Sequence, residues 1–93
     1  MDIRYDKKAD AIYILFDNIP YSYGKSLDDE RHIDYGDNGE VRGVELLCVS
    51  EGVITDDLPN RAEIERALED RVRITKGVNK GKTGTIVGKV IER

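Results

Sequence analysis

The segment RHIDYGDNGEVRGVELLCV (residues 31–49) predicts a β-hairpin, and the expected fold extends outward from it. Asn38-Gly39 supplies the positive φ angles that a tight hairpin turn requires. The first strand is expected over RHIDY (31–35) and the returning strand over EVRGVELLCV (40–49). Gly43 in the returning strand is expected to mark a β-bulge.

Two further strands are expected upstream of this hairpin. Ile3 and Tyr5 alternate with polar residues, which indicates a strand at the start of the chain. AIYILF (11–16) is an apolar run too short for a good helix and rich in isoleucine and aromatic residues, so it predicts a buried central strand. DNIPYSYGKS (17–26) is expected to form a loop, because Pro20 cannot donate to a sheet ladder.

The hydrophobic period changes after residue 57, and a short helix is expected over residues 59–70. Asn60 and Glu63 have the spacing of a capping box, in which each side chain satisfies a free backbone N–H group. Arg61 and Glu65, at i and i+4, are expected to pair on the exposed face. The apolar stripe of this helix is Ile64, Ala67 and Leu68.

The C-terminal segment predicts two more strands. VRIT (72–75) resumes strand alternation, KGVNKGK turns the chain, and TGTIVGKVI (83–91) forms the last strand. The predicted fold is α+β, a mostly antiparallel sheet of about six short strands with one helix, in the order β-β-β-β-α-β-β. We expect a single domain over residues 1–93, made of a β-meander module (1–58), the helix and a basic hairpin (71–93).

Charge is divided unequally along the chain. Charged residues make up 37% of it, and the net charge is −4. Residues 1–70 contain 8 basic and 18 acidic residues, whereas residues 71–93 contain 7 basic residues and one acid. High charge without glutamine or tryptophan is a tendency of thermophilic proteins. The lack of a long apolar run and the lone Cys48 lead us to expect a cytoplasmic protein without a membrane span or a disulfide.

The N-terminal half resembles a known family, the domain of unknown function 2283. The residues that carry the resemblance are IRYDKKADAIYILF (3–16) and LDDERHIDYGDNGEVRGVELL (27–47). The resemblance implies a small β-rich module with no established catalytic residues. Such modules can lie beside genes for small toxin-like proteins, which suggests an antitoxin-like binder of a small basic protein. Asp28, Asp29 and Glu30 form an acidic cluster that could neutralise such a partner.

The C-terminal segment VRITKGVNKGKTGTIVGKV (72–90) looks like a KOW motif, the short element of ribosomal proteins and transcription elongation factors. That resemblance implies contact with RNA or protein. Glycines allow backbone N–H groups to approach phosphate, and lysines release counterions. An ordinary structural hairpin explains the same residues, and no aromatic residue in 71–93 is present to stack on bases. The candidate nucleic-acid-binding residues are Arg71, Arg73, Lys76, Lys80, Gly81, Lys82, Gly84 and Lys89.

Other residue types that often carry chemistry are expected to be structural here. Residues 34–45 imitate a calcium-binding loop, but position 3 is Gly36 and strands flank the segment, so no metal or other cofactor is expected. His32 is expected on the surface, and Cys48 in the core. No nucleophile, base and orienting group can be assembled, so we expect no enzyme. We expect a non-catalytic interaction module that forms a homodimer, because its core is small and its sheet has edges.

Overall fold

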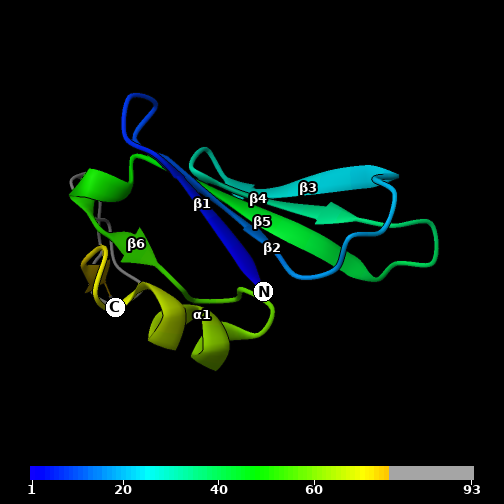
Figure 1. Cartoon of the computed structure of the whole chain (residues 1–93). Helices are drawn as coiled ribbons and strands as arrows, with labels where there is room; N and C mark the ends of the chain where they lie inside the picture. The colour runs from blue at the N-terminus through cyan, green and yellow to red at the C-terminus, as the bar shows by residue number, and fades with distance from the viewer. Residues whose placement is uncertain (76–93) are drawn as a thin grey trace. The chain divides into compact units, whose positions relative to one another are not determined.

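The computed structural model describes residues 1–75 of the chain (Figure 1). The chain divides into two compact units, Met1–Val49 and a second that begins at Ser50. Within the described residues, no helix is long and apolar enough to cross a membrane.

The first unit is an antiparallel sheet in which the first and third strands of the chain form the two edges (Figure 1). Its strand order is β1-β2-β5-β4-β3, and each neighbouring pair is antiparallel. The strands predicted around residues 3–5, 11–16, 31–35 and 40–49 are all present. The five strands are β1 (Asp2–Asp6), β2 (Ala11–Leu15), β3 (Tyr23–Asp28), β4 (Arg31–Tyr35) and β5 (Val41–Leu47).

One face of this sheet is apolar and buried. The alternation of side chains along a strand places every second residue on the same face. The register aligns Ile14 with Val44 and Val44 with Ile33, so these three side chains lie in one row across β2, β5 and β4. Ile12 and Leu46 form the next row of the same face, and all five side chains are at most 4% exposed.

The hairpin between β4 and β5 is confirmed, but its turn differs from the one predicted. Gly36 N donates to Glu40 O (2.8 Å), and Gly39 N donates to Gly36 O (3.1 Å). Within this turn positive φ occurs at Gly39 (84°) and not at Asn38, whose side-chain oxygen instead accepts from Glu40 N. A three-residue loop that ends in a left-handed glycine is the next most common hairpin connection.

The prediction of a continuous loop over residues 17–26 is wrong, because β3 begins at Tyr23. Pro20 remains outside the strand, as its missing N–H group requires. The register pairs Tyr23 with Tyr35 and Ser26 with His32. This strand is exposed at every residue except Asp28, so its sequence lacks the apolar alternation that reveals a buried strand.

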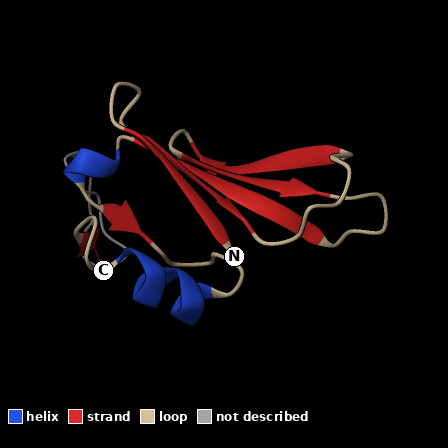
Figure 2. Ribbon diagram, in the orientation of Figure 1, coloured by secondary structure: helices blue, strands red, loops and turns tan. Residues whose placement is uncertain are grey.

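The described residues after the sheet, 48–75, contain one α-helix, a 3₁₀ turn and a parallel strand pair (Figure 2). The 3₁₀ turn spans Val49–Glu51, β6 spans Val53–Ile54, α1 spans Arg61–Leu68 and β7 spans Ile74–Thr75. The predicted strand at 72–75 is therefore present, but it pairs in parallel with β6, which the sequence did not reveal. The described order is five strands, β6, α1 and β7, which confirms the α+β class and corrects the order β-β-β-β-α-β-β.

Helix α1 is confirmed in its place, with a different start. Ile64 and Leu68 are buried, as the apolar stripe predicts. Asn60 makes no side-chain capping bond, because its backbone is left-handed (φ 53°), a conformation that asparagine tolerates better than most residues. The predicted pair is present, with Arg61 Nε 3.0 Å from Glu65 Oε2.

Candidate interaction surface

The second face of the five-stranded sheet is polar, and we call it the polar face. The register that buries Ile12 and Ile14 places the intervening residue, Tyr13, on this opposite face. One row of aligned residues crosses all five strands and contains a base, a phenol, an acid, an imidazole and a hydroxyl. The row consists of Arg4, Tyr13, Glu45, His32 and Ser26.

Tyr13 is the centre of a hydrogen-bond network on the polar face. Its hydroxyl donates to Asp34 Oδ2 (2.8 Å) and accepts from Arg42 Nη1 (3.0 Å). Arg42 Nε also donates to Ile19 O (2.8 Å), which joins β5 to the chain between β2 and β3. Burial, and next the hydrogen bond to Asp34, raise the pKa of Tyr13 above its ordinary value of 10.0, against the opposing effect of Arg42.

The bulge in β5 makes this network possible. Asp34 pairs with Gly43 and Tyr35 pairs with Val41, so Arg42 is the extra residue in β5. The bulge predicted beside Gly43 is therefore confirmed. A Cβ atom at Gly43 would stand 2.5 Å from the Tyr13 hydroxyl, so the absent side chain leaves the space in which that hydroxyl lies.

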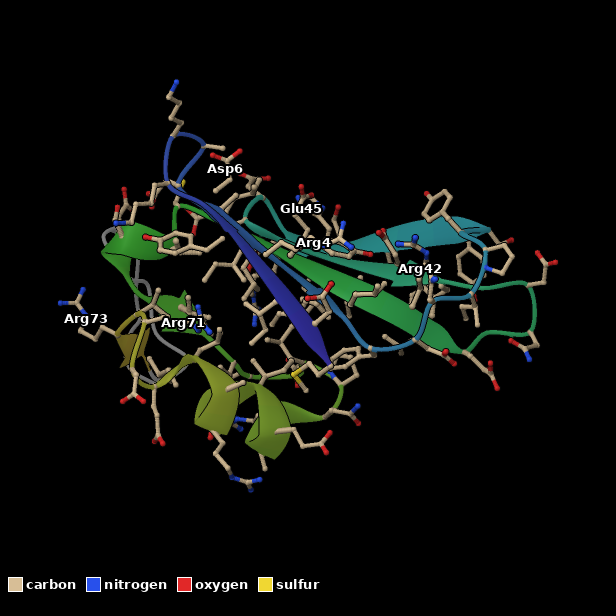
Figure 3. All side chains as sticks on the ribbon, viewed as in Figure 1. Arg4, Asp6, Arg42, Glu45, Arg71 and Arg73 are labelled. Carbon is tan, nitrogen blue, oxygen red and sulfur yellow. The ribbon has the colours of Figure 1, made fainter. Side chains whose placement is uncertain are left out.

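A shallow hollow of about 320 Å³ lies at the β1 side of the polar face. Ala11 and Leu47 contribute apolar surface to it. Three charged residues line it as well, namely Arg4, Asp6 and Glu45 (Figure 3). The hollow therefore combines charged side chains with an apolar base.

The two edges of the sheet differ in chemistry. Strand β1 carries a charged residue at every second position, Asp2, Arg4 and Asp6, and charges on an edge discourage pairing with another strand. Strand β3 has the sequence YGKSLD, in which Lys25 is the only charge before its last residue. The exposed apolar surface near β3 includes Tyr21 (59% exposed), Tyr23 (41%) and Leu27 (38%).

Two structural details shape the β3 edge. Tyr23 stacks on Tyr35 of the neighbouring strand, with ring centroids 5.0 Å apart and planes inclined by 15°. The register shifts between Ser26 and Asp28, so Leu27 is an extra residue in the strand. The regular part of the edge therefore spans residues 23–26.

Ser26 and His32 form a close side-chain contact on the polar face. Ser26 Oγ lies 2.6 Å from His32 Nδ1, and the register places Glu45 beside His32. All three belong to the row of aligned residues that crosses the polar face. Within the described residues no three histidine, cysteine or acidic side chains gather in a way that could hold a metal ion.

Residues 2–50 match the model of a family described as a protein of unknown function (DUF2283). The match covers more than half of the 93-residue chain. The chain belongs to the DUF2283 family. The resemblance predicted for the N-terminal half is confirmed, and the DUF2283 match coincides closely with the first unit, Met1–Val49. No curated protein and no solved structure matches the chain.

Most of the predicted nucleic-acid-binding residues lie outside the described part of this DUF2283 protein, and the KOW-like resemblance stays a prediction. Arg71 and Arg73 are described, and both are exposed (Figure 3). Arg73 Nη2 donates to Glu51 O (3.0 Å), so part of its guanidinium supports the second unit. The residues outside the described range are Lys76, Lys80, Gly81, Lys82, Gly84 and Lys89.

Other predicted residues serve the fold of the DUF2283 region. Asp28 Oδ2 accepts from Arg31 Nε and Asp28 Oδ1 from Glu30 N, both at 2.9 Å, so this acid organises the β3–β4 turn. His32 is half-buried in the polar row. Cys48 is also half-buried, with a φ angle of 54°, so its expected place in the core is wrong.

Sequence reasoning missed the Tyr13 network and the β3 edge. The alternation of Ile12, Tyr13 and Ile14 signals that Tyr13 faces away from the core, and a polar group on that face needs partners. Asp34 and Arg42 lie far from it in sequence, and only the strand order brings them together.

Proposed function

We propose that this DUF2283 protein is a non-catalytic protein-interaction module that self-associates, and that the outer edge of β3 is its binding element. The observation that carries the proposal is the exposure of β3 at every residue except Asp28 on the edge of a sheet. An exposed edge presents unpaired backbone groups, which another strand can satisfy by extending the sheet. Tyr23 and Leu27 add apolar surface at the same edge.

The contrast between the two edges supports the choice of β3 over β1. Pairing along β1 would bring Asp2, Arg4 and Asp6 against a second strand and would need charges in matching positions. Pairing along β3 involves only Lys25 within the regular run of residues 23–26.

Sedimentation equilibrium of the full chain tests self-association. The chain has a mass of 10.5 kDa, and we expect a second species of twice that mass to grow as the protein concentration rises. A single 10.5 kDa species at every concentration up to the millimolar range contradicts the proposal.

A second candidate function is binding of RNA or the ribosome through the basic C-terminal segment. Its support is the charge of residues 71–93, which contain 7 basic residues and one acid. If about four lysine–phosphate contacts form, log affinity for RNA should fall with log salt at a slope of roughly −3 to −4. Absence of binding to single-stranded and duplex RNA at low salt removes this candidate. Antitoxin-like binding of a basic protein stays a prediction from the acidic composition of residues 1–70.

A further inference from the structure

We infer that two copies pair antiparallel along β3 about Gly24, so that Tyr23 of one copy lies opposite Lys25 of the partner subunit. This inference rests on the proposed self-association and adds its geometry and register. The result is one continuous sheet in which the β3 strands of both copies are the central pair.

Symmetry limits the possible registers. Directly opposed residues in an antiparallel pair point to the same face, and a two-fold axis perpendicular to the sheet keeps each face continuous. The sequence numbers of two opposed residues must then differ by an even number. One residue of the strand therefore lies opposite the same residue of the second copy, and we say that the axis passes through that residue. Tyr23 is the first residue of the strand, so an axis there would leave no pairing on one side. Among the other residues of the regular run, the axis can pass through Gly24, Lys25 or Ser26.

Charge and strand geometry favour Gly24 among these three. An axis through Lys25 places two ammonium groups directly opposite each other, which is destabilising. An axis through Ser26 brings Leu27, the extra residue of the bulge, opposite Lys25. An axis through Gly24 keeps the pairing of residues 23–25 within the regular run. It also places Tyr23 of each copy opposite Lys25 of the partner subunit, which gives two such contacts.

The Tyr23 ring is arranged to receive a lysine. Tyr35 stacks on it at 5.0 Å and fixes its orientation, while 41% of the residue remains exposed. A lysine side chain can lay its methylene stem on an aromatic ring and place its ammonium near the ring face.

A matched pair of substitutions tests the register. Tyr23→Glu and Tyr23→Lys both remove the ring, but the first places a carboxylate opposite the partner's Lys25 and the second places an ammonium there. With two symmetric contacts, we expect Tyr23→Glu to dimerise about tenfold more tightly than Tyr23→Lys at low salt, measured by sedimentation equilibrium. Tyr23→Lys combined with Lys25→Glu restores opposite charges and should recover the affinity of Tyr23→Glu.

Tyr5→Glu and Tyr5→Lys provide the control, because they change the net charge by the same amounts as the two Tyr23 variants, but at the β1 edge. Their dimer affinities should be equal, and thermal melts should show that every variant is folded. A wild-type chain that stays monomeric overturns the proposed self-association itself. A wild-type dimer whose Tyr23→Glu and Tyr23→Lys variants bind equally, or a double variant without recovery, overturns the Gly24 register and leaves self-association intact.

Discussion

Gly43 lies where two groups approach the backbone too closely for any side chain. A Cβ atom there would stand 2.6 Å from the backbone oxygen of Ile14 and 2.5 Å from the Tyr13 hydroxyl. The Ile14 oxygen belongs to the backbone of the neighbouring strand, so no side-chain rotation can move it away. We expect Gly43→Ala to lower the free energy of unfolding by about 2–3 kcal/mol, measured by urea denaturation.

Gly39→Ala is the matched comparison, because its cost comes from backbone conformation and not from crowding. The φ angle of Gly39 is +84°, and the nearest atom to an added Cβ is the Tyr23 hydroxyl at 3.8 Å. We expect a loss of about 1 kcal/mol for Gly39→Ala. Equal losses for the two variants would show that the close approach at Gly43 does not exist.

The Tyr13 hydroxyl makes the stability of the protein depend on pH in the alkaline range. Its folded-state pKa is raised above 10.0 by burial and by the Asp34 hydrogen bond, so the folded state holds this proton more tightly than the unfolded state. The stabilising contribution is fully present below the ordinary pKa of 10.0 and is lost as the pH rises through the raised value.

Tyr13→Phe isolates this contribution. The substitution removes the bonds to Asp34 and Arg42, and we expect it to cost about 1 kcal/mol at pH 7. The difference in unfolding free energy between wild type and Tyr13→Phe should shrink as the pH is raised above 10, measured by urea denaturation between about pH 8 and 11. Tyr21→Phe serves as the control, and a difference that stays constant with pH would contradict the assignment.

At the scale of elements, the start of α1 depends on a buried hydroxyl. Thr55 is 0% exposed, and its Oγ1 donates to Glu65 Oε2 and accepts from Arg61 Nε (3.2 Å). Arg61 Nη2 also reaches Asp56 Oδ1 at 3.0 Å, so these side chains hold the first turn of the helix to the segment before it.

Thr55→Val keeps the shape of the side chain and removes its hydroxyl. We expect a loss of about 2 kcal/mol, because the buried hydroxyl that bonds both Glu65 and Arg61 is removed. Thermal and urea unfolding of the full chain measure the effect. Thr55→Ser should recover most of the stability, and Arg66→Ala on the exposed side of α1 should stay within about 0.5 kcal/mol.

Elements with a clear hydrophobic period were predictable from sequence. The alternating Ile12 and Ile14 and the helical stripe of Ile64 and Leu68 couple local residue choice to burial, and Gly39 supplies the positive φ angle that its turn requires. Strands β3 and β6 lack that coupling. The first is exposed on both faces, and the second has only two residues, so its identity depends on its parallel partner Ile74–Thr75.

The candidate surface was less predictable than the fold, because strand order and not sequence proximity creates it. Chain order would suggest that β3 lies beside β2, yet β5 occupies that position, and both β5 and β4 lie between β2 and β3. Only this arrangement aligns Tyr13 with Glu45 and then with His32, and makes β3 an edge. Local patterns carry no information about such long-range pairing.

For the whole molecule, the proposed dimer makes thermal stability depend on concentration. A partner that binds only the folded state stabilises it by mass action. We expect the Tm of the wild-type chain to rise by several degrees between about 10 µM and 1 mM, as followed by circular dichroism. Tyr23→Lys should lose most of this rise. A Tm independent of concentration for the wild type would contradict the proposed dimer.

The unlike edges of the sheet would also decide where the proposed assembly stops. In the language of polymer chemistry, a sheet with two receptive edges is a bifunctional monomer that grows into fibres, whereas one with a single receptive edge is its own chain terminator. When two copies join through β3, both free ends of the joined sheet are β1 strands bearing Asp2, Arg4 and Asp6. Neutralising those three charges would convert the terminator into a propagating unit, and the proposed dimers into filaments.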